Sequence, residues 1–230
     1  MTDGAVVVLG GSSGLGRAVA QHYADAGREV VINSRDREKG DAVAAEIGGS
    51  TRSVVLDLSE PRGIAAALAD VGPVDHLVIA AIERDDNRIR EYDIERAINL
   101  ATLKLVGYSE VVHTLVDRLS DDSSIVLFGG LAKERPYPGS TTVTTVNGGI
   151  VALVVTLATE LAPIRVNAIH PGIVGDSPYW KGKPLDHILA RTPTKRLVQM
   201  RDIVDAVRFL LENPSVNAID LRVDGGWMIM

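Results

Sequence analysis

The sequence predicts an α/β fold in which one doubly wound, seven-stranded parallel sheet carries helices on both faces. Short runs rich in β-branched residues alternate with longer segments of helical period, the pattern of strand-helix-strand units. Most of these runs are almost wholly apolar, which is typical of strands covered on both sides. The length of 230 residues fits one large domain, so residues 1–230 are expected to form a single unit.

The spacing of apolar residues along the sequence places the expected strands and helices. The expected strands are 5–10, 29–34, 52–57, 75–80, 124–129, 165–170 and 218–223. Helices are expected to begin near Leu15, Arg37, Pro61, Ile89, Thr141 and Arg201. The long irregular segment 171–197 contains Tyr179 and Trp180. Long loops after a strand of such a sheet are often functional, so this segment is predicted to be a lid over the ligand cleft rather than a solvated connection.

Composition argues against several classes of function. The net charge of −6 disfavours a nucleic-acid partner, because binding phosphates broadly requires a basic surface. There is no cysteine, and the five histidines lack metal-ligand spacing, so no metal site is expected. The sequence contains no run of about eighteen uncharged apolar residues, so no membrane span is expected. The N-terminal segment lacks the pattern of a secretory signal, and we expect a cytoplasmic location.

A glycine-rich turn joins the first expected strand to the first helix. The segment VVVLGGSSGLGRAVA contains the residues that would surround a phosphate: Gly10, Ser12, Ser13, Gly14, Leu15 and Gly16. Glycine permits a tight turn and lets backbone N–H groups approach a pyrophosphate, while the helix N-terminus attracts negative charge. Glycines here could serve turn geometry alone, but the strand-turn-helix context favours a Rossmann-type dinucleotide site.

The spacing Gly-xxx-Gly-x-Gly resembles that of the short-chain dehydrogenase/reductase family, and the resemblance covers essentially the whole chain. VVLDLSE, RVNAIHPGIV and RVDGGW are similar to the family's third strand, nicotinamide segment and last strand. The family's usual threonine before the glycines is Leu9 here. The resemblance implies an oxidoreductase fold with a nicotinamide cofactor and a further set of cofactor-lining residues: Asp57 at the adenine, then Leu58, Ala80, Ala81, Pro171, Gly172 and Val174.

The end of the second expected strand indicates which nicotinamide cofactor binds. Relatives that use NAD carry an acidic residue there, where it accepts hydrogen bonds from the ribose. This chain has Ser34 and Arg35 instead, and an arginine fork suits a 2′-phosphate. Ser12, Arg17 and Asn33 could also line this pocket. Arg35 could be an ordinary solvated charge, but a cation at a helix start opposes the helix dipole, so we predict NADP(H).

The family's reaction centre is only partly present. Members use an Asn, a Ser, a Tyr and a Lys, of which the tyrosine exchanges a proton with the substrate and the lysine lowers its pKa. Here Asn99 supplies the asparagine, while Gly130, Val143 and Asn147 stand at the Ser, Tyr and Lys positions. Valine has no proton to give and asparagine carries no charge, so the usual relay cannot operate. Asn147 can still hydrogen-bond ribose hydroxyls.

Few side chains could replace the missing acid. Tyr137 lies on the loop after the fifth expected strand, and His170 ends the sixth and could titrate near neutrality. Packing of a turn by Tyr137 and a structural role for His170 are equally open. Lys133 and Glu134 share the loop with Tyr137 but read as solvated charges, and Tyr179 of the lid could stack on a substrate instead.

Three functions follow from this pattern. The first is an NADP(H)-dependent oxidoreductase acting on a small carbonyl, alcohol or activated C=C substrate with atypical proton transfer. The second is a catalytically inactive NADP(H)-binding sensor or regulator. The third is a non-catalytic subunit that supports a relative. Apolar stripes in LKLVGYSEVVHTLV and GGIVALVVTLATEL predict a homodimer or homotetramer, though such stripes also serve the core. The enzyme is the favoured interpretation.

Overall fold

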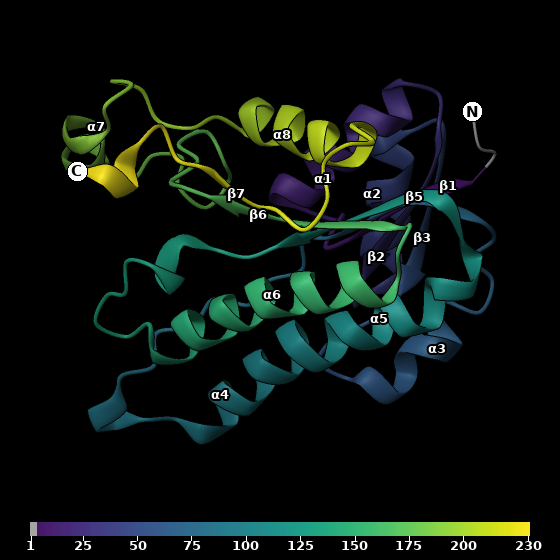
Figure 1. The fold of residues 1–230 in the computed structure, drawn as a ribbon, viewed down its shortest axis with the longest axis horizontal. Helices are drawn as coiled ribbons and strands as arrows, with labels where there is room; N and C mark the ends of the chain where they lie inside the picture. The colour runs from purple at the N-terminus through teal and green to yellow at the C-terminus, as the bar shows by residue number, and fades with distance from the viewer. Residues whose placement is uncertain (1–3) are drawn as a thin grey trace.

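The computed structural model describes residues 4–230 and contains one parallel sheet with strand order β3-β2-β1-β4-β5-β6-β7 (Figure 1). Its strands are β1 Ala5–Leu9, β2 Glu29–Ser34, β3 Ser50–Val55, β4 Val74–Ile79, β5 Leu119–Phe128, β6 Arg165–Pro171 and β7 Asp220–Val223. The predicted fold class is therefore confirmed. Residues 1–3, on which the expectation about the N-terminal segment partly rests, lie outside the described residues.

Several strand boundaries differ from the sequence prediction, and two of these differences have identifiable reasons. β5 starts at Leu119, five residues early, because its polar and largely exposed first half lacks the apolar pattern that marks a buried strand. β3 ends at Val55, so Asp57 lies in the turn that follows the strand. That turn is at the carboxyl edge of the sheet, where open α/β sheets bind ligands.

The helices are α1 Gly14–Asp25, α2 Arg37–Ile47, α3 Ile64–Ala67, α4 Ile94–Ala101, α5 Tyr108–Leu115, α6 Thr141–Glu160, α7 Asp186–Arg191 and α8 Met200–Glu212. The helix expected near Ile89 starts later, at Ile94, after a short 3-10 turn over Ile89–Glu91. A π-helical segment, Thr102–Gly107, joins α4 to α5. Such a segment was not predicted, since its apolar period is close to that of an α-helix.

The two faces of the sheet are covered by different helices. One apolar core lies between the sheet and α3, α5 and α6, and the other lies between the sheet and α1, α2 and α8. Figure 1 shows these two helical layers above and below the strands. Alternate residues of one strand enter opposite cores, as Val6 and Val7 do in β1. This is why the strands read as continuous apolar runs.

Helix α6 is long and apolar enough to cross a membrane by length and composition, with a mean hydropathy of 1.6. In this fold it packs on β6 and β5 instead, with Ile150, Val154 and Leu157 in the core. Its central residues are therefore apolar because they cover the sheet. Only part of the helix is buried, however, and Val155 is exposed.

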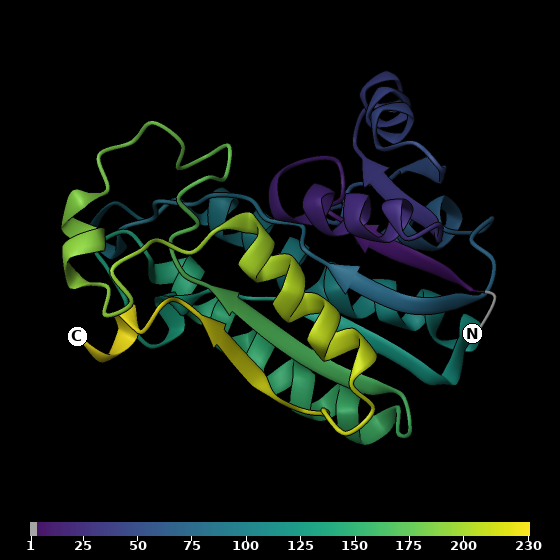
Figure 2. The same cartoon turned by 90° about the horizontal axis from the view of Figure 1, so that it is seen from above.

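The segment 171–197 is less irregular than predicted. It contains α7, and an isolated parallel bridge between Val174 and Val198 joins its two ends. Figure 2 shows this segment beyond the carboxyl ends of β6 and β7. The helix was missed because Asp186–Arg191 is too short to display a period.

Candidate active site

The glycine turn after β1 is tightly packed on one side and open on the other. Gly10 has φ of +87°, and a Cβ there would lie 2.5 Å from the Ala81 backbone nitrogen. A Cβ on Gly16 would lie 2.2 Å from the Gly10 carbonyl oxygen, so helix α1 can approach β1 only without a side chain. Gly14 has φ of +54° and nothing within 4 Å of its Cβ position. Ser13 precedes α1 in an extended conformation without capping it, which leaves the first N–H groups of α1 free of a side-chain acceptor.

Asn33 holds this turn in shape from behind. Its side-chain oxygen accepts a hydrogen bond from the Gly10 N–H at 2.6 Å, and its amide nitrogen donates to the Leu56 carbonyl at 2.9 Å. The side chain is buried, with both ends of its amide engaged. It was predicted to line the 2′-phosphate pocket, but this geometry makes it a support for the glycine turn.

Arg35 projects into solvent from the end of β2. Its side chain is 72% exposed, and its guanidinium lies 3.9 Å from the Asp57 carboxylate. Asp57 uses its other oxygen to accept hydrogen bonds from the backbone and hydroxyl of Ser59. The Asp36 side chain caps α2 by accepting from the Lys39 N–H. Because Asp36 already offsets the helix dipole, Arg35 needs no anionic ligand for that purpose.

Other residues predicted around this pocket are arranged as follows. Arg17 pairs with Glu46 of α2 at 2.7 Å, and the Ser34 hydroxyl accepts a hydrogen bond from the Asp36 N–H at 3.2 Å. Ser12 is half-buried in the glycine turn, and Leu15 is half-buried in the first turn of α1. Leu58 is buried beneath the turn after β3.

A buried polar network lies beneath the ends of β4 and β5. The Lys104 ammonium donates to the Tyr108 hydroxyl and to the Phe128 carbonyl, each at 2.7 Å. The Tyr108 hydroxyl donates in turn to the Ala81 carbonyl at 2.7 Å. Burial lowers the pKa of Lys104 to about 7 and raises that of Tyr108. Ala80 is fixed separately, because its N–H donates to the Leu9 carbonyl at 2.7 Å.

The positions of the missing catalytic residues lie side by side. Gly130 follows β5, and a Cβ on it would be 2.8 Å from the Asn147 amide nitrogen. Asn147 is buried in α6, yet its side chain makes no hydrogen bond to any residue in 4–230. Val143 is half-buried one turn earlier on the same helix. Asn147 therefore presents an unpartnered amide beside Gly130, as a ligand-binding side chain would.

Asn99, the retained member of the family set, is on α4. Its amide donates to the Glu83 carboxylate at 2.6 Å, in the segment that follows β4. This contact joins α4 to the strand-end loop. Asn99 thus has a positional role in addition to any contact with a ligand.

His170 lies inside the fold, at the end of β6. Its ring is fully buried, with Nδ1 3.2 Å from the Gly130 carbonyl and Nε2 in contact with the Asp220 carboxylate. Burial lowers its pKa. Asp220 also accepts a hydrogen bond from the Lys133 ammonium at 2.7 Å. Nδ1 and Nε2 lie against the Gly130 carbonyl and the Asp220 carboxylate and the ring is fully buried, so His170 is placed to support the Gly130 segment and not to reach a substrate.

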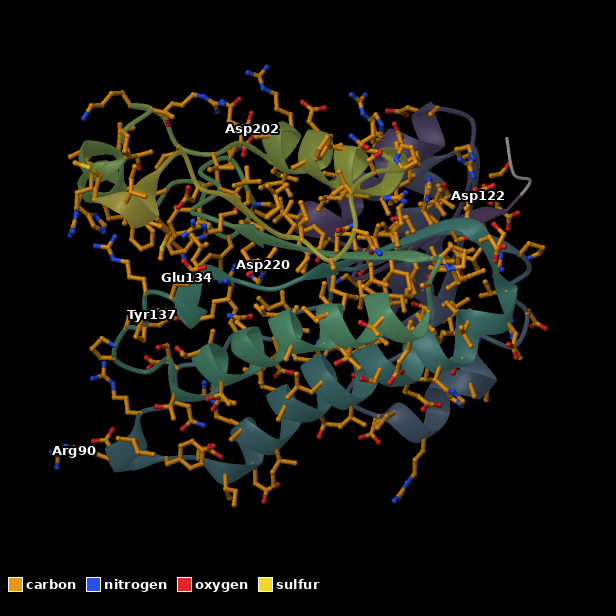
Figure 3. All side chains as sticks on the ribbon, viewed as in Figure 1. Arg90, Asp122, Glu134, Tyr137, Asp202 and Asp220 are labelled. Carbon is orange, nitrogen blue, oxygen red and sulfur yellow. The ribbon has the colours of Figure 1, made fainter. Side chains whose placement is uncertain are left out.

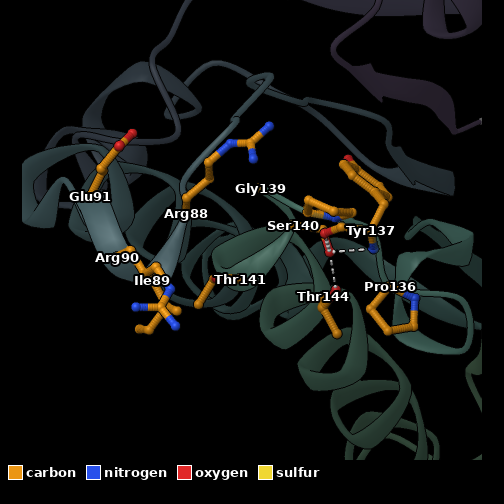
Figure 4. Close-up of a pocket in the computed structure, with 11 residues that line it drawn as sticks. Arg88, Ile89, Arg90, Glu91, Pro136, Tyr137, Gly139, Ser140, Thr141 and Thr144 are labelled. Carbon is orange, nitrogen blue, oxygen red and sulfur yellow. Dashed lines mark hydrogen bonds between the residues drawn. The ribbon is translucent and has the colours of Figure 1, made fainter.

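Tyr137 is 53% exposed on the loop between β5 and α6, and Figure 3 labels it at the same end of the molecule as Glu134. Its hydroxyl has no hydrogen-bond partner within residues 4–230, and burial raises its pKa. The loop is held by the Ser140 hydroxyl, which accepts from the Tyr137 N–H at 2.9 Å. Tyr137 also lines an open depression of about 500 Å³ between the 88–91 turn and the start of α6 (Figure 4).

The residues expected near the nicotinamide follow β6. Pro171 ends the strand, and the Gly172 N–H donates to the Val223 carbonyl at 2.8 Å. A Cβ on Gly172 would meet Asp224 at 2.9 Å. Val174 is buried in its bridge to Val198. These contacts fix the start of the segment 171–197 at the carboxyl ends of β6 and β7.

Sequence reasoning missed two groups of residues near the site. Lys104 could have been noticed as a lone charge within the apolar run TLKLVGY. The second group is Arg84 and Lys183, which both contact the Tyr179 ring. No local pattern brings these residues together, because they lie on loops after different strands.

Comparison with known proteins agrees with this geometry. The family profile described as Enoyl-(Acyl carrier protein) reductase matches residues 10–228. The 3-oxoacyl-[acyl-carrier-protein] reductase of Mus musculus is 31% identical, with 97% of this chain and 98% of that protein covered. L-xylulose reductase of Mus musculus is 28% identical, with 96% and 95% covered.

A solved structure gives the same result. The 3-ketoacyl-(acyl-carrier-protein) reductase from Brucella melitensis, complexed with NADH, has a TM-score of 0.86 and 26% identity, with 98% of each chain covered. The match therefore spans the glycine turn, residues 130–147 and the segment 171–197. The chain belongs to the short-chain dehydrogenase/reductase family of oxidoreductases, which use a nicotinamide cofactor.

Proposed function

We propose that this protein is an NADP(H)-dependent oxidoreductase that acts on a small carbonyl or alcohol through an atypical proton donor. Two neighbouring features carry the proposal. The open glycine turn follows β1, and the exposed guanidinium of Arg35 follows β2, the next strand in the sheet. A planar guanidinium pairs well with a phosphate, and the carboxylate nearest to Arg35 is 3.9 Å away. Arg35 is thus available to a 2′-phosphate.

The residues present fit such a cofactor. The free N–H groups at the start of α1 suit a pyrophosphate, and the positive φ at Gly14 keeps that face open. The unpartnered amide of Asn147 suits the hydroxyls of a ribose. When bound, the nicotinamide supplies or accepts the hydride of the reaction.

Tyr137 is the proposed proton donor. Among residues 4–230 its hydroxyl has no hydrogen-bond partner, and burial raises its pKa above the ordinary value of a phenol, which is protonated at neutral pH. A protonated hydroxyl can give a proton to the carbonyl oxygen of a substrate during reduction, and the phenolate that remains would accept a proton in the reverse reaction.

The nucleotide preference is tested by titrating the protein with NADPH and NADH and following the fluorescence of the reduced nicotinamide. NADPH is expected to bind more tightly. Arg35→Ala should weaken NADPH by about 10- to 100-fold, the value of a charge-assisted contact, and leave NADH unchanged. Arg37→Ala is the matched control, since Arg37 lies two residues further on at the start of α2. Equal affinity of wild type for both nucleotides would refute the NADP(H) assignment.

Turnover separates the enzyme from a protein that only binds the cofactor. With a panel of carbonyl compounds, NADPH oxidation is expected in the wild type and should fall at least tenfold in Tyr137→Phe, which loses only the hydroxyl. Tight NADPH binding without oxidation of any compound in the panel would favour the sensor. The absence of a family Tyr and Lys at Val143 and Asn147 is the feature that keeps this second function in view.

We also propose that the protein forms a homodimer or homotetramer through α4, the π-helical segment and α6. These elements contact one another and carry four apolar side chains that are more than half exposed: Ile94, Ile98, Val106 and Val155. Large apolar side chains gathered on neighbouring helices are typical of a protein interface. A second copy would cover them.

A further inference from the structure

Three loops meet beyond the carboxyl ends of β4, β5 and β6. The loop after β4 carries Arg84, the loop after β5 carries Tyr137, and the lid after β6 carries Tyr179 and Lys183. The Arg84 guanidinium carbon lies 3.1 Å from the centre of the Tyr179 ring, and the Lys183 nitrogen lies 3.2 Å from it. Two groups so close to one ring centre must be on opposite faces. Tyr179 is therefore held between two cations that come from different loops.

Neither cation has a carboxylate to offset its charge. Within residues 4–230, no carboxylate oxygen lies within 4.0 Å of Arg84 or Lys183. The acidic side chains beside Arg84 in the sequence each have another partner: Glu83 with Asn99, Asp85 with Arg96 and Asp86 with Arg88. Partial burial also lowers the pKa of Arg84. Both side chains are exposed, and an anion bound at the rim of the ring, within reach of the two cations, would offset both charges.

The position of the pair indicates what the anion belongs to. In the sheet, β2 and β1 carry Arg35 and the glycine turn on one side of the switch between β1 and β4. Arg84 and Lys183 follow β4 and β6, on the other side. A dinucleotide with its phosphates on the glycine turn would direct its nicotinamide toward β4 to β6. The loops that carry the two cations therefore leave the sheet on the half where the nicotinamide and a substrate would lie.

We propose that Arg84 and Lys183 bind an anionic group of the substrate, so that the preferred substrates are small carbonyl compounds bearing a carboxylate or a phosphate. This inference rests on the proposed function, because it assigns the substrate class of the same site. The arginine fork matches either anion, and the lysine adds a point charge. Tyr179 holds the lid against the loop after β4 by cation–π contacts and positions both cations. Tyr137, the proposed acid, is within the electrostatic reach of Arg84.

The test compares matched pairs of compounds that differ in charge. Acetoacetate is compared with methyl acetoacetate, and dihydroxyacetone phosphate with dihydroxyacetone. Binding is followed by the fluorescence of Trp180, whose ring lies 4.8 Å from that of Tyr179. The protein carries Trp227→Phe to remove the second tryptophan, and each titration is done with and without saturating NADP⁺. The anion of at least one pair should bind at least ten times more tightly than its neutral partner, and that pair identifies the anion as carboxylate or phosphate.

Variants separate this site from general charge attraction. Arg84→Gln and Lys183→Gln should each reduce the preference for the anion to less than threefold, while Arg84→Lys should retain part of it. Lys181→Gln is the control, because Lys181 is two residues from Lys183 but contacts neither ring. Circular dichroism checks that each variant is folded.

Two results would overturn the proposal. One is equal binding of anion and neutral partner in the wild type, and the other is a preference that survives both glutamine substitutions. NADPH binding is measured separately by nicotinamide fluorescence, so loss of the proposed cofactor is distinguishable from loss of the anion site. If no nucleotide binds, the titrations without nucleotide still decide whether the two cations hold an anion.

Discussion

At the scale of single residues, Lys104 is the most unusual group in the fold. It is a fully buried amine whose only hydrogen-bond partners within residues 4–230 are a hydroxyl and a carbonyl. Removing an ammonium from water without a counterion is costly, which is why burial lowers its pKa to about 7. Its contacts join Phe128 at the end of β5 to the loop after β4 through Tyr108. The network thus fixes two strand ends that border the site.

Lys104 makes stability depend on pH in a defined direction. Its pKa is about 7 in the folded chain and near 10.5 in the unfolded one, so the unfolded chain binds more protons between these values. The free energy of unfolding should therefore rise with pH through this window, by up to about 1.4 kcal/mol per pH unit. Below about pH 7 both states are protonated and this dependence ends.

The variant Lys104→Met keeps the side-chain length and removes the titration. The unfolding free energy is measured by urea denaturation from pH 7 to 9.5. Its slope against pH should be smaller than that of wild type by about 1.4 kcal/mol per pH unit, which corresponds to one proton. The difference between the two proteins cancels the contributions of all other groups. Parallel curves would show that Lys104 does not titrate in this window.

Gly130 and Asn147 are so close that the effect of a substitution at one on stability should depend on the residue at the other. A Cβ at Gly130 lies 2.8 Å from the Asn147 amide nitrogen, so Gly130→Ser should destabilise the fold by about 1 kcal/mol. Adding Asn147→Ala should remove most of this cost. A double-mutant cycle from denaturant unfolding measures the coupling, and strict additivity would show that the two positions do not touch.

At the scale of elements, the sequence predicted what local pattern controls. The apolar runs of β1, β4 and β6 predicted their strands to within two residues at either end, because two buried faces demand such runs. The polar start of β5 and the short helix α7 were missed, because neither has a distinctive period. The glycine turn was placed correctly, but the support from Asn33 depends on a contact across 23 residues. Contacts of that kind leave no trace in local spacing.

The junction of β1 and α1 gives a prediction for the glycine turn as an element. A methyl group at Gly16 would lie 2.2 Å from a backbone oxygen, which cannot move aside like a side chain. Gly16→Ala should therefore lower the unfolding free energy by about 1–3 kcal/mol and weaken NADPH binding, because α1 must shift away from β1. Both effects can be measured by urea denaturation and nicotinamide fluorescence.

The control for this substitution is Gly148→Ala in α6. Gly148 is in the interior of a helix, with nothing within 4 Å of its Cβ position. The same change there should leave NADPH binding intact and stabilise the fold by about 0.5–1 kcal/mol, since alanine favours helix. If Gly16→Ala were equally harmless, close packing of α1 on β1 would not be the reason for glycine.

At the scale of the whole molecule, the carboxyl edge of the sheet gathers the residues that matter. Strand order alone brings the glycine turn, Gly130 and the base of the lid to one edge, although they are far apart in the chain. The fold and the edge could be predicted for this reason. The contacts of the His170 ring with Gly130 and Asp220 could not be predicted, because burial of this ring depends on packing among three separate segments. That burial moves the proposed proton donor to Tyr137.

The assembly is the last property of the whole molecule that can be tested. Exposed apolar side chains on α4 and α6 make these helices the proposed contact between copies, and a charge placed there would have to be buried without a partner. Val155→Asp should therefore convert a dimer or tetramer into a smaller species, as measured by size-exclusion chromatography with light scattering. Val55→Asp, on the edge strand β3, is also exposed but lies outside these helices and should leave the mass unchanged. A wild-type monomer at all concentrations would mean that α4 and α6 carry their exposed residues for another reason, whereas dissociation by both variants would place the contact elsewhere.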